Sequence, residues 1–458
     1  MNELDHIQVE LAGRNLIEAS AGTGKTYAIA SLYLRLLMEK ELTPEQILVV
    51  TYTEAATKEL RGRIRNRIRE ALALFSGGTT TDPLLTSLAA NSNGKGPTRE
   101  QARERLSRAL TAFDTASIFT IHGFCLRALK ENAFESGSLY DTELVTDQSV
   151  LLREIADDFW RIRFFARPAP LLGYALRRKF SASFFLEFLS GMLGNPKLKI
   201  VPNYSQDDIA AMEAGCETAF QSVRLEWRQQ RQQIILLLQN DKGLSRGPYK
   251  IDLLPGLLAE LDSFTTGNNP FDLGAGFAKV TASGIAQGTK PTGTAPDHPF
   301  FHSCEALQRR VEERFLALQW ELIVFARDRL KARKKETNIR FFDDLLNDLY
   351  GALCGESGGA LASRLSEKYR AALIDEFQDT DPVQYDIFRR IYDNPDSPLF
   401  LIGDPKQAIY SFRGADIFAY LEAAADVAGE NRFTLTGNWR STPRLLTALN
   451  MLDRKSVV

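Results

Sequence analysis

A short segment near the start of the chain combines glycines with a lysine and a threonine, residue types that bind nucleotide phosphates. It follows the apolar pair Leu16-Ile17 and precedes a helical pattern. In such a loop, backbone N–H groups and the helix N-terminus cradle phosphate oxygens, while the lysine reaches the β- and γ-phosphates and the threonine hydroxyl ligates Mg²⁺. The alternative is a glycine-rich turn that contains a lysine but binds no nucleotide. We predict a site for ATP or GTP with Mg²⁺ at Ala19, Ser20, Ala21, Gly22, Thr23, Gly24, Lys25 and Thr26.

Two acidic residues follow an apolar strand pattern much later in the chain. Asp375 and Glu376 come directly after Leu373-Ile374. In a parallel sheet, the carboxyl ends of strands border the ligand crevice. One carboxylate can hold Mg²⁺ and a second can polarise the attacking water, so we assign Asp375 to magnesium and Glu376 to the general base. A solvated turn is the alternative. Because Lys25 and Asp375 must meet around one nucleotide, a large insertion has to separate the two halves of the sheet.

A second polar segment follows the apolar run Leu401-Ile402. Gln407 could hydrogen-bond the γ-phosphate or the attacking water. Tyr410, Phe412 and Arg413 lie just beyond it. Two aromatic rings and a cation suit stacking on unpaired bases with a phosphate contact nearby, whereas a core turn with buried aromatic residues explains the composition equally well.

An arginine and a tryptophan stand side by side near the end of the chain. The guanidinium of Arg440 could pair with γ-phosphate oxygens, and the ring of Trp439 could stack on a nucleobase. A surface arginine and a packed tryptophan are the alternatives for this pair.

The composition is that of an ordinary globular protein. The chain has 458 residues, of which 44% are hydrophobic and 25% charged, and its formal net charge is −2. Such a charge provides no global basic field, so a nucleic-acid site must be a local patch. The four cysteines are scattered without a CxxC pair, which argues against a zinc site and a disulfide framework. A signal pattern and a membrane-spanning apolar run are both lacking, which predicts a cytoplasmic protein.

The periodicity predicts an α/β fold with a parallel sheet and a large, mainly helical insertion. Strand patterns occupy 14–20, 47–52, 116–120, 371–374, 399–402 and 433–435, and helical patterns occupy 24–40, 55–75, 99–113 and 381–392. Residues 76–98 are rich in Gly, Ser, Thr and Asn and predict a mobile surface loop. From about 140 to 335, helical patterns dominate, and 304–335 predicts one long helix.

Six segments occur in the order seen in superfamily 1 UvrD-like DNA helicases, a family of P-loop NTPases with RecA-like sheets, and the chain resembles that family over residues 16–441. The segments are Ala19–Thr26, Thr51–Ala56, Thr120–Cys125, Asp375–Thr380, Gly403–Ala415 and Asn438–Ser441. Three stretches resemble in particular its RecB-type members, the β subunits of exodeoxyribonuclease V. They are Leu16–Thr26, Glu54–Ile64 and Arg340–Leu346.

The resemblance implies roles that composition alone does not give. It places Gln378, Gln407 and Arg440 at positions that sense the γ-phosphate, and Trp439 at the position that stacks on adenine. The positions that touch single-stranded DNA are Tyr52, Thr53, Thr120, His122, Tyr410 and Phe412. It also implies 3′-to-5′ polarity, action in double-strand-break repair and recombination, and partners like the RecC and RecD subunits.

The implied domains follow the same resemblance. We expect the first part of helicase domain 1A at 1–140, an inserted helical 1B-like domain at 141–335, and the second part of domain 1A at 336–435. The start of domain 2A, a second motor lobe that is only begun, is expected at 436–458.

The sequence departs from the family pattern at both ends. Members of the family have an upstream glutamine that reads adenine, and the nearest candidate here is Gln8. Motifs beyond Arg440, and a C-terminal nuclease domain, are absent. The segment Asp453–Val458 interrupts a helical pattern and is what GAT-CGG-AAG-AGC-GTC-GTG, a string that resembles a sequencing adapter, would encode, so we expect an artificial stop. With one motor lobe and the start of a second, we expect weak or no ATP hydrolysis by the 458-residue chain. The alternatives are a stand-alone UvrD-type or AddA-type helicase and a nucleotide- and DNA-binding fragment without turnover.

Overall fold

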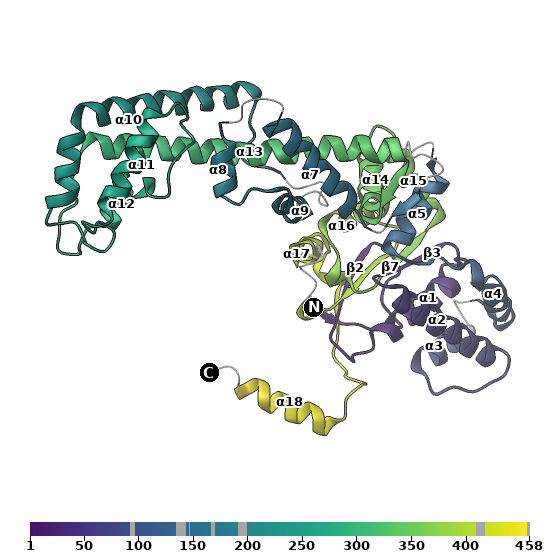
Figure 1. Cartoon of the computed structure of the whole chain (residues 1–458). Helices are drawn as coiled ribbons and strands as arrows, with labels where there is room; N and C mark the ends of the chain where they lie inside the picture. The colour runs from purple at the N-terminus through teal and green to yellow at the C-terminus, as the bar shows by residue number, and fades with distance from the viewer. Residues whose placement is uncertain are drawn as a thin grey trace. The chain divides into compact units, whose positions relative to one another are not determined.

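The computed structural model describes residues 1–91, 97–133, 143–145, 147–165, 170–190, 199–408 and 417–455. Over these residues the chain divides into two compact units, shown in Figure 1. Unit 1 consists of Met1–Leu144 with Arg340–Val458, and unit 2 is the intervening segment Val145–Ile339.

Unit 1 is built on a parallel sheet that has seven strands within the described residues, in the order β1-β9-β2-β8-β7-β3-β4. Each neighbouring pair runs parallel, which confirms the predicted fold class. In chain order, the strands are β1 (Asn2–Glu3), β2 (Arg14–Ala19), β3 (Ile47–Thr51), β4 (Ile118–Thr120), β7 (Ala371–Ile374), β8 (Leu399–Gly403) and β9 (Arg432–Leu435).

Helices cover both faces of this sheet, and consecutive strand residues contribute to opposite cores. Ile17 and Val49 pack in the core beneath the first set of helices, whereas Leu16 and Leu48 pack in the core of the other face, as the two-residue period of a strand requires. The first set is α1 (Lys25–Glu39), α2 (Glu54–Phe75), α3 (Pro83–Asn91) and α4 (Arg99–Thr111). The second is α5 (Ile121–Glu131), α14 (Phe342–Cys354), α15 (Gly358–Lys368), α16 (Pro382–Ile391) and α17 (Ile417–Asp426).

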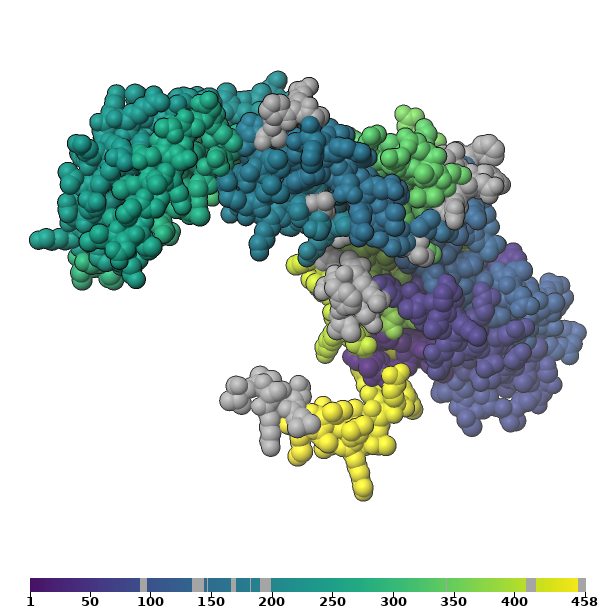
Figure 2. Space-filling model, viewed as in Figure 1, coloured from purple at the N-terminus to yellow at the C-terminus, as the bar shows by residue number. Residues whose placement is uncertain are grey.

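The prediction of a mobile loop over 76–98 is wrong for α3. Asp82 accepts a hydrogen bond from the backbone N–H of Leu85 at 3.0 Å, and Pro83 follows it at the first helical position, where proline is tolerated. Leu84 and Leu85 are buried in the core shared with α1 and α2. The purple-to-blue surface of α1 to α4 is continuous in Figure 2. Two buried leucines therefore outweigh the loop-like composition, and residues 92–96 lie outside the described part of the chain.

Unit 2 is helical, as predicted, and the predicted helix at 304–335 is confirmed and begins earlier, at Pro299. The two longest helices, α10 and α13, lie side by side (Figure 1). The fully buried Arg314 of α13 pairs with Glu213 of α10 at 2.8 Å. Its helices are α7 (Ser149–Phe164), α8 (Leu172–Arg177), α9 (Ala182–Ser190), α10 (Gln206–Asn240), α11 (Leu254–Thr266), α12 (Ala282–Gln287) and α13 (Pro299–Thr337).

The remaining elements are short or lie near the ends of the units. β5 (Glu143–Val145) pairs with β6 (Ile339–Phe341) in a separate two-stranded sheet. The 3₁₀ turns are η1 (Phe113–Thr115), η2 (Phe277–Val280), η3 (Phe377–Asp379), η4 (Pro405–Gln407) and η6 (Gly429–Asn431). Helix α18 (Pro443–Lys455) continues through Asp453, Arg454 and Lys455, so the prediction that these residues interrupt the helix is wrong. Residues 456–458 lie outside the described ranges. Within those ranges, every helix is too short or too polar to cross a membrane.

Candidate functional site

The loop between β2 and α1 has the backbone of a phosphate cradle. Gly22 and Gly24 have φ angles of 81° and 96°, a left-handed conformation that favours glycine. The N–H and hydroxyl of Thr23 both donate to the carbonyl oxygen of Ser20, at 3.1 and 2.7 Å, which closes the loop. Gly24 is the N-cap of α1 and has no side chain to accept hydrogen bonds. The first-turn N–H groups beside Lys25 and Thr26 therefore remain as donors for an anionic ligand.

The acidic pair after β7 meets the lysine of this loop. Lys25 Nζ lies 2.6 Å from Glu376 Oε2, and the side-chain amide of Gln378 donates to the same oxygen at 2.7 Å. Glu376 has a φ of 51°, a conformation that costs about 1–2 kcal/mol in a residue other than glycine. The fold thus holds Glu376 in a strained backbone geometry that brings its carboxylate to Lys25.

Asp375 and Asp379 lie beside this pair in a poorly solvated environment. Burial, with the neighbouring charge of Glu376 adding to it, raises the pKa of Asp375 to about 6. The same two causes raise the pKa of Asp379 to about 6. Carboxylates that are crowded together and desolvated in this way gain from a nearby cation.

The donor set fits a magnesium ion that is bound together with nucleotide phosphates. The carboxylate of Asp375 and the hydroxyl of Thr26 are hard oxygen ligands, and Mg²⁺ at such sites takes one or two carboxylates plus substrate phosphates. The Oδ1 atom of Asp379 is buried without a hydrogen-bond partner, so an acceptor here is left unsatisfied by the protein. Across the described ranges, no group of three or more His, Cys, Asp or Glu side chains is arranged to hold a metal.

A chain of hydrogen bonds connects Glu376 to Gln407. The carbonyl oxygen of the Gln378 side chain accepts from the backbone N–H of Asp404 at 2.9 Å. The carboxylate of Asp404 in turn accepts from the side-chain amide of Gln407 at 2.6 Å. A Cβ on Gly403 would lie 2.7 Å from Gln378 Oε1, so glycine permits this close approach. The structure brings the predicted residues Gln378 and Gln407 into one network, and sequence reasoning missed Asp404, which joins them.

The segment after β9 lies against the phosphate loop. The backbone N–H of Trp439 donates to the carbonyl oxygen of Gly22 at 2.8 Å, and the side-chain amide of Asn438 donates to that of Ala21 at 3.2 Å. Asn438 Oδ1 also accepts from the backbone N–H of Arg440 at 3.0 Å. A main-chain hydrogen bond therefore holds Trp439 beside the loop, and the side chain of Asn438 links Arg440 to it.

Replacing Gly22 with alanine is expected to destabilise unit 1 by more than the same change at Gly24. Both residues have positive φ, so both pay a backbone cost of about 1–2 kcal/mol. A Cβ at position 22 would lie 2.7 Å from the Cβ of Arg440, whereas at position 24 its nearest neighbour is 3.8 Å away. Thermal unfolding of the two variants without nucleotide measures the difference. Equal losses would show that the Arg440 segment is not packed against Gly22.

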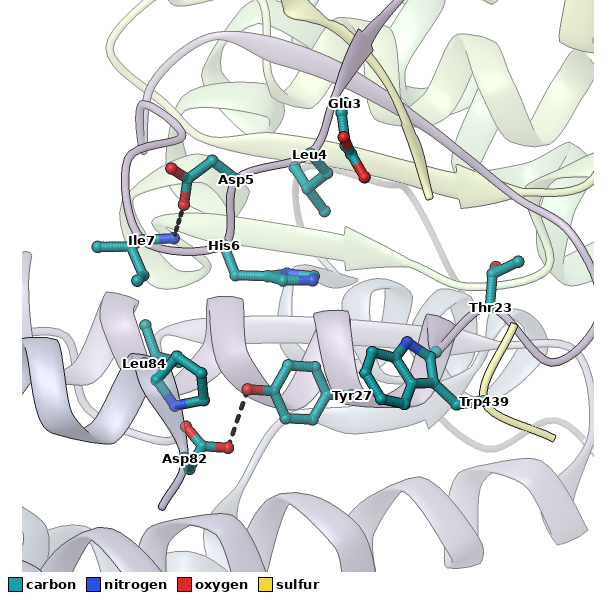
Figure 3. Close-up of a pocket in the computed structure, with 12 residues that line it drawn as sticks. Glu3, Leu4, Asp5, His6, Ile7, Thr23, Tyr27, Asp82, Leu84 and Trp439 are labelled. Carbon is teal, nitrogen blue, oxygen red and sulfur yellow. Dashed lines mark hydrogen bonds between the residues drawn. The ribbon is translucent and has the colours of Figure 1, made fainter. Parts of the chain in front are cut away.

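A cavity of about 730 Å³ opens next to the loop, and Figure 3 shows its lining. The rings of Tyr27 and Trp439 lie next to each other along one side, and the ring of His6 contacts that of Tyr27 edge-on, with centres 5.3 Å apart. Burial lowers the pKa of His6, so its imidazole is neutral at pH 7. The lining residues are Glu3, Leu4, Asp5, His6, Ile7, Thr23, Gly24, Tyr27, Asp82, Pro83, Leu84 and Trp439.

The predicted DNA contacts that the structure describes lie after two neighbouring strands, β3 and β4. Thr53 caps α2 by accepting from the N–H of Ala56 at 3.1 Å, and Thr120 caps α5 by accepting from that of Gly123 at 3.2 Å. Both threonines thus have structural roles. Tyr52 and His122 stand beside them in sequence, at the same edge of the sheet. Tyr410, Phe412 and Arg413 lie outside the described residues.

Phe342 is a candidate that sequence reasoning missed. It begins α14, is 41% exposed, and its ring lies 5.7 Å from that of His122 in an edge-to-face arrangement. The only signal for it in the sequence is that it belongs to Arg340–Leu346, one of the stretches with a RecB-type resemblance. Its ring and that of His122 form an aromatic surface suited to unpaired bases.

Residues 1–240 and 300–428 match the model of the UvrD/REP helicase N-terminal domain. The chain is also similar to curated proteins named RecBCD enzyme subunit RecB. That of Escherichia coli (strain K12) is 37% identical over 98% of this chain and 38% of the relative. That of Haemophilus influenzae is 34% identical over 98% of this chain and 40% of the relative. The chain thus spans about two fifths of the length of these two relatives.

Proposed function

The chain belongs to the UvrD/REP helicase family, and from that premise we propose that it is an ATP-dependent DNA helicase or translocase subunit of RecB type, acting in double-strand-break repair and recombination. The observation that carries the proposal is the 2.6 Å contact between Lys25 and Glu376. It joins the phosphate loop after β2 to the acidic strand end of β7, and thus assembles the two halves of an ATP-hydrolysing site.

The residues of the proposed ATP site divide the work by their chemistry. Lys25 and the loop amides bind phosphate oxygens, and Glu376 accepts the proton of the attacking water. Thr26 and Asp375 would hold Mg²⁺, which when bound neutralises charge on the phosphates. Gln378, Gln407 and Arg440 sense the γ-phosphate, and Trp439 stacks on the base. Gln407 directly precedes the segment that carries Tyr410 and Phe412, so we propose that this network couples phosphate state to DNA contact.

For DNA and protein partners the proposal follows the names of the relatives. Because they are RecBCD subunits, we propose a complex with RecC-like and RecD-like proteins, acting on single strands and duplex ends in the cytoplasm. Single-stranded DNA would lie over the carboxyl ends of β3 and β4, against Tyr52, Thr53, Thr120, His122 and Phe342.

Alanine at His122 or at Phe342 is expected to weaken binding of a fluorescent oligothymidylate by about 5- to 100-fold, because stacking on an aromatic side chain contributes about 1–3 kcal/mol per base. Fluorescence anisotropy of the 458-residue chain measures the affinity. The matched control is Trp439→Ala. It removes an aromatic side chain that lies in the proposed nucleotide site and is 86% exposed. In the absence of nucleotide, this change should leave the DNA affinity unchanged. Unchanged affinity in both test variants would contradict the DNA surface.

A second candidate function is nucleotide and DNA binding without turnover. The observation that favours it is the ion pair between Lys25 and Glu376 Oε2, an oxygen that also accepts a hydrogen bond from Gln378. ATP hydrolysis requires both contacts to rearrange. Single-stranded-DNA-stimulated hydrolysis of ATP separates the two functions. Stimulation that Lys25→Ala removes supports the helicase proposal, and tight binding of both ligands with no phosphate release supports the alternative.

A further inference from the structure

Tyr27 presents its ring to the cavity and yet is fixed on three sides. It follows Lys25 and Thr26 in the first turn of α1 and is 39% exposed. Its hydroxyl donates to Asp82 Oδ2 at 2.9 Å, and the ring of His6 meets it edge-on at 5.3 Å. An exposed ring held this firmly offers a flat apolar surface at little entropic cost to a planar ligand.

Arg67 supports the same ring from α2. Its guanidinium carbon lies 4.8 Å from the centre of the Tyr27 ring, and its Nη2 donates to the tyrosine hydroxyl at 3.1 Å. The arginine is itself buried and forms a two-point pair with Asp82, at 2.8 and 2.9 Å. Such a bidentate pair fixes the guanidinium plane, and with it the ring that the plane supports.

Both oxygens of Asp82 are occupied within the protein. Besides Arg67 and Tyr27, the carboxylate accepts from the N–H of Leu85 at the start of α3. The Asp82 carboxylate and the Tyr27 hydroxyl are therefore satisfied within the protein, whereas Arg67 Nε and His6 Nδ1 are buried without a hydrogen-bond partner among the described residues. What Tyr27 offers to a ligand in the cavity is its aromatic ring (Figure 3). The wall depends on the connection between α2 and α4, which composition had assigned to a loop.

We propose that Arg67 and Asp82 are positioning residues that hold the Tyr27 ring as a stacking surface for the base of the nucleotide. The inference rests on the proposed function, since it takes the cavity beside Lys25 to be the base site. It assigns the pair to the base alone, because the side-chain hydrogen bonds of Arg67 and Asp82 lead to Tyr27, Glu70 and the start of α3.

The test compares ATP with inorganic tripolyphosphate, which has the phosphates without the base. Isothermal titration of the 458-residue chain with each ligand measures both affinities for Arg67→Met, Asp82→Ala and Tyr27→Ala. The expected result is a loss of ATP affinity of about 5- to 20-fold, in line with the removal of one stacking contact, and tripolyphosphate affinity within about twofold of the parent. Tyr27→Phe keeps the ring and should recover most of the ATP affinity that Tyr27→Ala loses.

Each contrary result identifies what is wrong. Unchanged ATP affinity in all three variants overturns the stacking surface, and equal losses for both ligands show that the pair only supports the loop. Because Arg67 is buried, Tyr27→Ala serves as the variant that removes the ring from the surface and leaves the Arg67–Asp82 pair in place. Arg105→Met, which breaks an ion pair with Glu41 at 2.6 Å, is the matched control and should change neither affinity. A parent chain that binds neither ligand would instead refute the proposed function itself.

Discussion

Replacing Lys25 with alanine is expected to abolish ATP hydrolysis and to weaken ATP binding by at least about 30-fold. Its ammonium lies at the first turn of α1, is 14% exposed, and is already paired with Glu376 at 2.6 Å. With ATP bound, the ammonium would pair with phosphate oxygens, and removing one partner of a desolvated charge pair between binding partners costs about 2–5 kcal/mol, or about 30- to 5,000-fold in affinity. Titration with ATP and with tripolyphosphate measures the loss, and it should be similar for both ligands because Lys25 faces the phosphates.

The matched control for that variant is Lys40→Ala. Lys40 ends the same helix and is exposed, so its removal should leave both affinities unchanged. If Lys25→Ala binds ATP as tightly as the parent, the loop at Gly22–Thr26 does not bind the triphosphate. That result would contradict the proposed ATP-dependent function.

Six strands of unit 1 were predictable because their local sequence reflects their surroundings, whereas the two exposed residues of β1 gave no such signal. A strand of a parallel sheet that is buried on both faces needs apolar residues at every position, and Ile47–Val50 meets that requirement. The same reasoning expected polar groups beyond the strand ends, and Glu376 and Gln407 do follow β7 and β8. Their shared edge of the sheet follows from parallel pairing, which brings the carboxyl ends together.

The cavity beside the phosphate loop could not be predicted in the same way. Its walls come from the first residues of the chain, the start of α1, the α2–α3 connection and the segment after β9. Only tertiary packing joins these segments, and no periodic signal in any one of them points to the others. Asp82 illustrates the difficulty: in a stretch of glycine and threonine it looks like a solvated turn residue, and its partner Arg67 looks like one of several cations on a helix face.

Asp404 was missed for a related reason. An acidic residue after a strand is common at solvated turns. Asp404 differs because its carboxylate accepts hydrogen bonds from the backbone N–H of Lys406 and from the side-chain amide of Gln407. The resemblance identified Gln407 but not the residue that orients it. Residues that position others are therefore found from contacts, whereas residues that touch a ligand can be recognised from motif order.

Glutamine at position 376 is expected to lower the rate of ATP hydrolysis by about 10²- to 10⁴-fold, the usual contribution of a general base, while ATP affinity stays equal or rises. The amide keeps the size of the side chain but cannot accept the proton of the attacking water. It also releases Lys25 from its 2.6 Å ion pair, which otherwise competes with the phosphates for the ammonium.

Single-turnover hydrolysis with single-stranded DNA measures the rate, and titration with a non-hydrolysable ATP analogue measures the affinity. Glu367→Gln, the same change at an exposed position of α15, is the control for the loss of one negative charge on this side of the sheet. A parallel fall of rate and affinity would mean that Glu376 holds the loop in shape and that the base of the reaction lies elsewhere, with Asp379 the first residue to test because its pKa is also raised to about 6.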